Sequence, residues 1–112
     1  LKLVLPAIVE CMADGADLLP MVKPQFEVGK DRLGSGGVVR SNELRAEVTT
    51  DVALFAQSLG LSLKGVTASP LPGPSGNVEY FLWLVKDAGE TALAPEAVAE
   101  MVATAVKEGP QN

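Results

Sequence analysis

The sequence lacks histidine and has a single cysteine, Cys11, among its 112 residues. Without an imidazole, the chain by itself forms neither a Ser-His-Asp triad nor a metal site that uses histidine. One cysteine cannot close an internal disulfide or build a thiolate cluster, which favours a reducing compartment. We therefore predict no metal site, and any proton acceptor in this chain is expected to be a lysine or a carboxylate.

Long hydrophobic runs are also absent. The longest apolar runs span residues 3–9 and 80–85, whereas a membrane-spanning helix needs roughly 18 apolar residues or more. No basic segment precedes an apolar stretch with a cleavage site, so no secretory signal is predicted. Because the chain starts with Leu1 inside an apolar periodic segment, we expect it to be a piece of a longer protein. The short apolar runs and the single cysteine lead us to expect that this protein is soluble and cytoplasmic.

The composition is that of a small globular unit. Hydrophobic residues make up 47% and charged residues 21%, and a typical domain has roughly 150 residues, so two independent cores are excluded. The formal net charge of −5 is unevenly spread: residues 23–45 are net basic and residues 87–112 are strongly acidic. The basic part includes a glycine-rich segment, residues 27–41, which is either a phosphate-contacting loop or a solvated surface loop.

Periodicity predicts three helices and three strands in the order α-β-α-β-β-α. Proline at position 20 counts against the first strand, because proline cannot donate to a strand ladder. The third strand is nearly continuous in apolar residues, so we expect both of its faces to be covered and Phe81 and Trp83 to be core residues. Cys11 lies on the apolar stripe of the first helix and is expected to be an inert core thiol. The predicted elements are a helix over residues 1–12, a strand over 16–22, a helix from Ser41 or Asn42 to 59, strands over 61–68 and 78–85, and a helix over 95–107.

This order predicts an α/β fold. A strand, a helix and a second strand imply a right-handed parallel crossover, and a short connection over residues 69–77 implies an antiparallel hairpin. The pattern matches the C-terminal half of a doubly wound α/β domain. Because so small a sheet leaves edges and a face uncovered, we expect upstream strands or a second copy, in a homo-oligomer, to cover them.

Two charged residues stand out by their position in this topology. Lys23 follows the first predicted strand, at the edge where open α/β sheets place ligands. Glu79 begins the antiparallel strand, which starts at that same edge. The two side chains are therefore predicted to meet, although the alternative of a solvent-facing Lys-Pro corner and an exposed glutamate stays open.

Two long motifs carry a family resemblance. Residues 23–30 (KPQFEVGK) with residues 34–40 (GSGGVVR), and residues 69–80 (SPLPGPSGNVEY), resemble the signature blocks of the TlyA-type proteins. The resemblance implies S-adenosylmethionine-dependent 2′-O-methylation of cytidine in 16S and 23S ribosomal RNA, linked to susceptibility to capreomycin-type antibiotics. It also implies that this chain is the C-terminal half of a Rossmann-like methyltransferase domain. An upstream cofactor-binding half and an S4-like RNA-binding domain would complete the protein.

The resemblance also assigns site residues. Related 2′-O-methyltransferases use a Lys-Asp-Lys-Glu tetrad, in which Lys23 matches the second lysine and Glu79 the glutamate. The first lysine, the aspartate and the cofactor loop would lie upstream, so these 112 residues alone are expected to be inactive. Lys23 is expected to act as general base or to orient the ribose hydroxyl, and Glu79 to position Lys23 or the ribose. The residues expected to contact RNA are Phe26, Lys30, Arg32 and Arg40.

Two other functions stay open at this point. Older naming of the family suggests a membrane-lytic hemolysin, but a surface-active helix would need a polar face rich in Lys and Arg, and the last predicted helix is acidic. A purely RNA-binding module without catalysis is the third interpretation.

Overall fold

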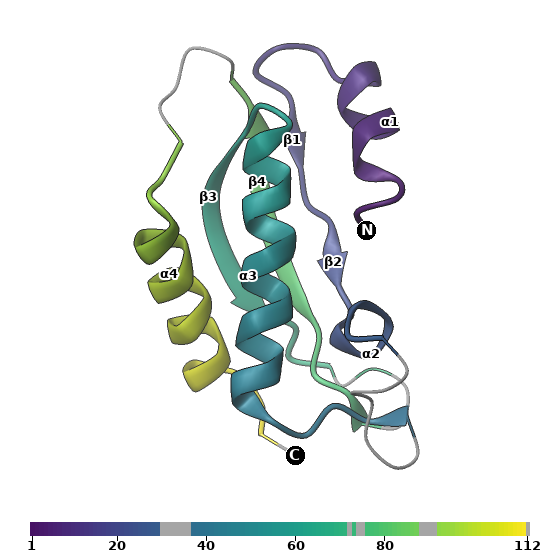
Figure 1. Ribbon diagram of the computed structural model, residues 1–112, viewed down its shortest axis with the longest axis vertical. Coiled ribbons are helices and arrows are strands. Elements are labelled where there is room, and N and C mark those ends of the chain that lie inside the picture. The colour runs from purple at the N-terminus through teal and green to yellow at the C-terminus, as the bar shows by residue number, and fades with distance from the viewer. Residues whose placement is uncertain (30–36, 72, 74–75, 88–91, 112) are drawn as a thin grey trace.

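The computed structural model describes residues 1–29, 37–71, 73, 76–87 and 92–111 (Figure 1). These residues form four helices and four strands, and the molecule has extents of 42 × 25 × 24 Å. The elements are α1 (Leu5–Cys11), β1 (Asp17–Leu18), β2 (Met21–Val22), α2 (Pro24–Glu27), α3 (Asn42–Ser58), β3 (Leu61–Ala68), β4 (Tyr80–Lys86) and α4 (Pro95–Glu108).

The strand β4 lies between β3 on one side and β1 with β2 on the other, and all three pairings are antiparallel. The predicted hairpin between β3 and β4 is confirmed. The predicted parallel neighbours are wrong: β2 and β3 run in the same direction, but β4 separates them. The strand β4 pairs through one edge with β3 and through the other with β1 and β2. The connection from β2 to β3 therefore crosses over β4.

Pro20 explains why the first predicted strand is split in two. Its ring removes a backbone donor, and the ladder is interrupted between β1 and β2. The Pro20 carbonyl still accepts a hydrogen bond of 3.1 Å from the Leu82 amide. The chain therefore stays against β4 along this segment, and both short strands keep the direction predicted for residues 16–22.

One side of the sheet is covered by α3 and α4, which lie side by side against it (Figure 1). Ser41 begins α3 as its N-cap, accepting a hydrogen bond from the Leu44 amide at 3.2 Å, as the sequence predicted. The helix α1 adds Leu5 and Val9 to the same core. The buried side chains that form the centre of this core include Val52, Ala53, Ala56, Leu82, Leu84, Val98 and Val102.

Two core predictions are wrong. Trp83 is 48% exposed and Phe81 is only partly buried, because β4 alternates between a covered and an open face. The Trp83 indole N–H donates to Asp17 Oδ1 at 2.8 Å across the open face. Cys11 is exposed at the last turn of α1, because Leu5 and Val9 rather than the whole predicted stripe turn towards the core.

Candidate functional site

The candidate site lies at the end of the sheet where β2 and β3 finish and β4 begins. Tyr80 pairs with Val22 on one side and with Ala68 on the other, so these three residues form one row across the sheet. The next residue outward on each segment is Lys23, Glu79 or Ser69. The Ser69 amide donates to the Glu79 carbonyl at 2.8 Å, which extends the ladder past its last strand residue.

Lys23 stands at the junction of β2 and α2. It is the N-cap of α2 with extended dihedral angles, and its carbonyl accepts from the Phe26 amide at 2.9 Å. Pro24 occupies the first helical turn, where its missing N–H costs nothing. The sequence analysis missed this one-turn helix, which turns the chain sharply at the sheet edge and leaves Lys23 partly buried.

Glu79 is buried, with 5% of its surface exposed. Its Oε2 atom accepts a hydrogen bond of 2.9 Å from the side-chain amide of Gln25, on α2. In the described part of the chain, Lys23 and Glu79 form no ion pair within 4.0 Å. The structure thus brings both predicted residues to one end of the sheet, with the Gln25 amide rather than an ammonium group on the carboxylate.

Asn77 connects residues 37–39, in the glycine-rich segment, to this end of the sheet. Its Oδ1 atom accepts from the Val39 amide at 2.8 Å, and its Nδ2 atom donates to the Gly37 carbonyl at 2.9 Å. Arg45, on α3, is fully buried and donates to the Val39 carbonyl from Nε at 3.3 Å and from Nη2 at 3.0 Å. Residues 37–39, in the described part of the glycine-rich segment, are therefore held from two directions.

Tyr80 has a buried phenol behind this row. Burial raises the pKa of Tyr80 above its ordinary value of 10.0, and the nearby Arg45 guanidinium partly opposes that shift. In the described structure the Tyr80 hydroxyl has no hydrogen-bond partner, and the same holds for Gln25 Oε1. The phenol is therefore neutral at physiological pH.

The predicted RNA-contacting residues are placed only in part. Phe26 projects from α2 with 72% of its surface exposed, and Arg40 is exposed just before α3. Lys30 and Arg32 lie outside the described residues. Gln25, Asn77 and Arg45 were missed by the sequence analysis, although the first two lie inside the quoted motifs and so carried a signal.

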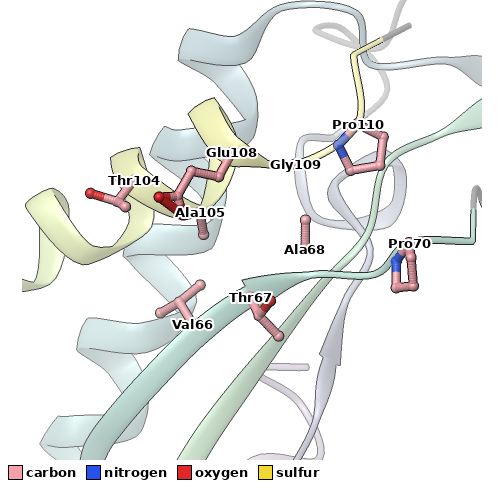
Figure 2. A pocket seen from close by; sticks show the side chains of 9 residues that line it. All are labelled: Val66, Thr67, Ala68, Pro70, Thr104, Ala105, Glu108, Gly109 and Pro110. Atoms are coloured by element: carbon pink, nitrogen blue, oxygen red, sulfur yellow. The ribbon is translucent and has the colours of Figure 1, made fainter.

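Two neighbouring cavities lie elsewhere, along β3 and α4. One has a volume of about 450 Å³ and is enclosed by the end of β3 and the C-terminal turn of α4, with Ala68 facing Gly109 and Pro110 (Figure 2). The other, of about 510 Å³, is lined by residues that include Val66, Leu93 and Met101. Neither includes Lys23 or Glu79. No cluster of three or more Cys, Asp or Glu side chains suited to a metal ion occurs in the described ranges.

Comparisons with known proteins agree on one family. The family model of FtsJ-like methyltransferases matches residues 2–86. The chain is 54% identical over 110 residues to the 16S/23S rRNA (cytidine-2′-O)-methyltransferase TlyA of Mycobacterium tuberculosis, covering 98% of this chain and 41% of that protein. It is 33% identical over 72 residues to the 23S rRNA (cytidine-2′-O)-methyltransferase TlyA of Campylobacter jejuni, covering 63% of this chain and 28% of that one.

A solved structure is also similar. It comes from Streptococcus thermophilus, is provisionally described as a hemolysin, and superposes with a TM-score of 0.81 at 37% identity. The match covers 96% of this chain and 38% of the other. The chain therefore spans about two fifths of the length of the Mycobacterium and Streptococcus proteins, and the resemblance expected from the two motifs is confirmed.

Proposed function

Because the chain belongs to the family of FtsJ-like methyltransferases, we propose that it forms part of an enzyme that methylates cytidine 2′-hydroxyl groups in ribosomal RNA. The methyl donor is S-adenosylmethionine, as in methyltransferases of this kind generally. Residues 1–112 form the C-terminal half of a Rossmann-like domain in this proposal, and the cofactor-binding half belongs to a preceding part of the protein. The chain covers 41% of the Mycobacterium relative, which supports its being part of a longer enzyme.

The observation that carries the proposal is that Lys23 and Glu79 lie at the same end of the sheet. They flank the paired residues Val22 and Tyr80, although 56 positions separate them along the chain. A lysine and a buried carboxylate at one sheet end are groups suited to handling the proton of a hydroxyl group. The two residues match the lysine and glutamate that the motif resemblance assigned.

The residues of this chain have separate tasks in the reaction. A ribose 2′-hydroxyl is a weak nucleophile until its proton is removed or strongly shared, and the Lys23 amine holds or accepts that proton. Glu79 orients the Lys23 ammonium or a neighbouring ribose hydroxyl. S-adenosylmethionine, when bound, supplies the methyl group on its sulfonium, so the remaining task of the protein is to place the hydroxyl in line with that group.

The groups at the sheet end that holds Lys23 and Glu79 suit the hydroxyl groups of a ribose. They are an amine, a carboxylate and an amide, which bind hydroxyl groups. Following the motif resemblance, we assign hydroxyl handling to these residues and cofactor binding to upstream residues.

RNA would reach this edge past α2 and the basic segment that precedes α3. Phe26 offers an exposed ring for contact with a base, and Arg40 an exposed guanidinium for phosphate. Lys30 and Arg32 are assigned to phosphate contacts from the sequence alone.

The direct test replaces Lys23 in the full-length protein that carries this chain. We expect K23A to lower the transfer of labelled methyl groups from S-adenosylmethionine to ribosomal RNA by about 10²- to 10⁴-fold, because it removes the proton acceptor. Cofactor binding, measured by calorimetry, is expected to be unchanged. The control is K107A, which removes an exposed lysine from the last turns of α4. Full activity of K23A would refute the assignment.

A second candidate, membrane lysis, is favoured by the description of the Streptococcus structure as a hemolysin. In the part of the chain that the structure describes, no helix is both long and apolar enough to cross a membrane. The exposed face of α4 carries Glu96, Glu100 and Glu108, which anionic lipids repel. Dye release from anionic liposomes by purified, lipid-free protein would support lysis, whereas methyl transfer without dye release supports the proposed function.

A further inference from the structure

We infer that Gln25 is a positioning residue for Glu79, and that Gly73 provides the space in which the held carboxylate lies. The inference rests on the proposed function, because it assumes that Glu79 serves the methyl transfer. It adds two residues to which neither the motif resemblance nor the comparisons assign a role.

The inference starts from the hydrogen bond between Gln25 and Glu79. The Gln25 Nε2 atom donates to Glu79 Oε2 at 2.9 Å, and both side chains are more than nine-tenths buried. The orientation of the amide follows from chemistry, because a Gln25 oxygen in that place would put two acceptors together. In the described structure no other side chain donates to this carboxylate. Gln25 is thus the group that determines where the Glu79 carboxylate points.

The second step is the close approach of Gly73. A Cβ atom at this position would lie within 3.0 Å of both carboxylate oxygens of Glu79, closer than real Cβ atoms come to a neighbour. The Gly73 amide donates to the Asn77 carbonyl at 2.7 Å, which fixes the turn against the carboxylate. A side chain at this position would therefore displace the carboxylate, and Glu79 lies between Gln25 and the backbone at Gly73.

The helix α2 connects Gln25, and through it the Glu79 carboxylate, to Lys23. Gln25 is two residues after Lys23, on the one-turn helix whose first hydrogen bond is accepted by the Lys23 carbonyl. The same short helix therefore sets the position of the lysine and of the amide that holds the glutamate. A shift of α2 would move both groups together, so the spacing between Lys23 and Glu79 is built into this turn.

The test is a double-mutant cycle in the full-length protein. Methionine matches glutamine in length but has no N–H, so Q25M removes the donor with little change in volume. We expect Q25M to lower kcat for ribosomal RNA methylation by about 10- to 100-fold, with KM for RNA nearly unchanged. The double variant Q25M/E79Q is expected to be no slower than E79Q alone, because Gln25 acts through Glu79.

The matched control is Q57M, which removes an amide that bonds the backbone of Leu93, far from Glu79. We expect it to leave kcat unchanged. If the fold-losses in kcat of Q25M and E79Q multiply in the double variant, the inference is overturned, because Gln25 would then act elsewhere.

A second pair of variants tests the glycine. G73A is expected to lower kcat by pushing the carboxylate aside, whereas G65A is not, because the nearest atom to a Cβ at Gly65 is Trp83 Cε3 at 3.7 Å. A G73A enzyme with the kcat of G65A would overturn the role given to Gly73.

Stability measurements separate the inference from the proposed function. If E79Q retains full activity, the role proposed for Glu79 is wrong. The Gln25–Glu79 contact is then judged from urea unfolding of Q25M, E79M and the double variant, because methionine at position 79 removes the acceptor. Absence of coupling between Q25M and E79M overturns the contact as well.

Discussion

At the scale of single residues, some buried polar atoms behind the candidate site have hydrogen-bond partners and others have none. Asn77 and Arg45 are fully buried, and each makes at least two hydrogen bonds to the backbone of the 37–39 segment or to Asn42. The Tyr80 hydroxyl and Gln25 Oε1 are buried without a partner in the described part of the chain. An unpartnered buried hydroxyl costs free energy, so the Tyr80 hydroxyl lowers the stability of the fold.

Replacing Tyr80 with phenylalanine should therefore be tolerated by the fold. We expect Y80F to leave the free energy of unfolding unchanged or to raise it by about 1 kcal/mol at pH 7, because it removes a desolvated hydroxyl. The pKa of Tyr80 is raised in the folded state, so the unfolded state releases this proton first as the pH rises past 10.0. Stability is thus lost at alkaline pH in the parent protein.

Y80F should lack the part of the alkaline loss of stability that Tyr80 causes. Urea unfolding at pH 7 and above pH 10 measures it, and the same alkaline loss in Y80F would show that other groups cause it.

At the scale of elements, the cap of α3 and the bounds of β3 were easier to predict than the faces of the strands. The Ser41 cap and the bounds of β3 agree with the sequence, because capping and period-2 patterns depend on near neighbours. The exposure of Trp83 could not be predicted, since six consecutive apolar residues do not show which face the helices cover. The turn at α2 was missed because a single helical turn has no period.

The segment before α3 should depend on Asn77. Replacing this residue with leucine removes two hydrogen bonds and leaves the Val39 amide and the Gly37 carbonyl without their partner. We expect N77L to destabilise the protein by about 2–4 kcal/mol. Hydrogen exchange at the Val39 amide is expected to accelerate. Unchanged exchange there would mean that Asn77 does not hold the segment.

At the scale of the whole molecule, charge is divided between two regions. By sequence, residues 23–45 are net basic, and of these Lys23 lies at the candidate site and Arg40 is exposed just before α3. The exposed acidic residues of α4 lie on the helix beyond α3 (Figure 1). An RNA backbone is attracted to the first region and repelled by the second. The net charge of −5 therefore describes α4 and its surroundings better than the proposed RNA-binding edge.

This division predicts the salt dependence of RNA binding. In the full-length protein, R40Q is expected to weaken binding and to reduce the slope of log K against log salt by about 0.7–0.9, the contribution of one phosphate contact. K107Q, on the acidic helix, should leave the slope unchanged. Filter binding at several salt concentrations measures both, and equal slopes for R40Q and the parent protein would exclude a phosphate contact at Arg40.

Local periodicity, capping and chain direction were enough to predict α1, α3 and α4, the hairpin, and the placement of Lys23 and Glu79 at one edge of the sheet. These features need no knowledge of distant contacts. The packing of whole elements was needed to place β4 between β2 and β3, to turn Trp83 outward, and to bring the Gln25 amide onto the Glu79 carboxylate. Those features join residues up to 66 positions apart, and such pairings depend on how whole elements pack rather than on any local pattern.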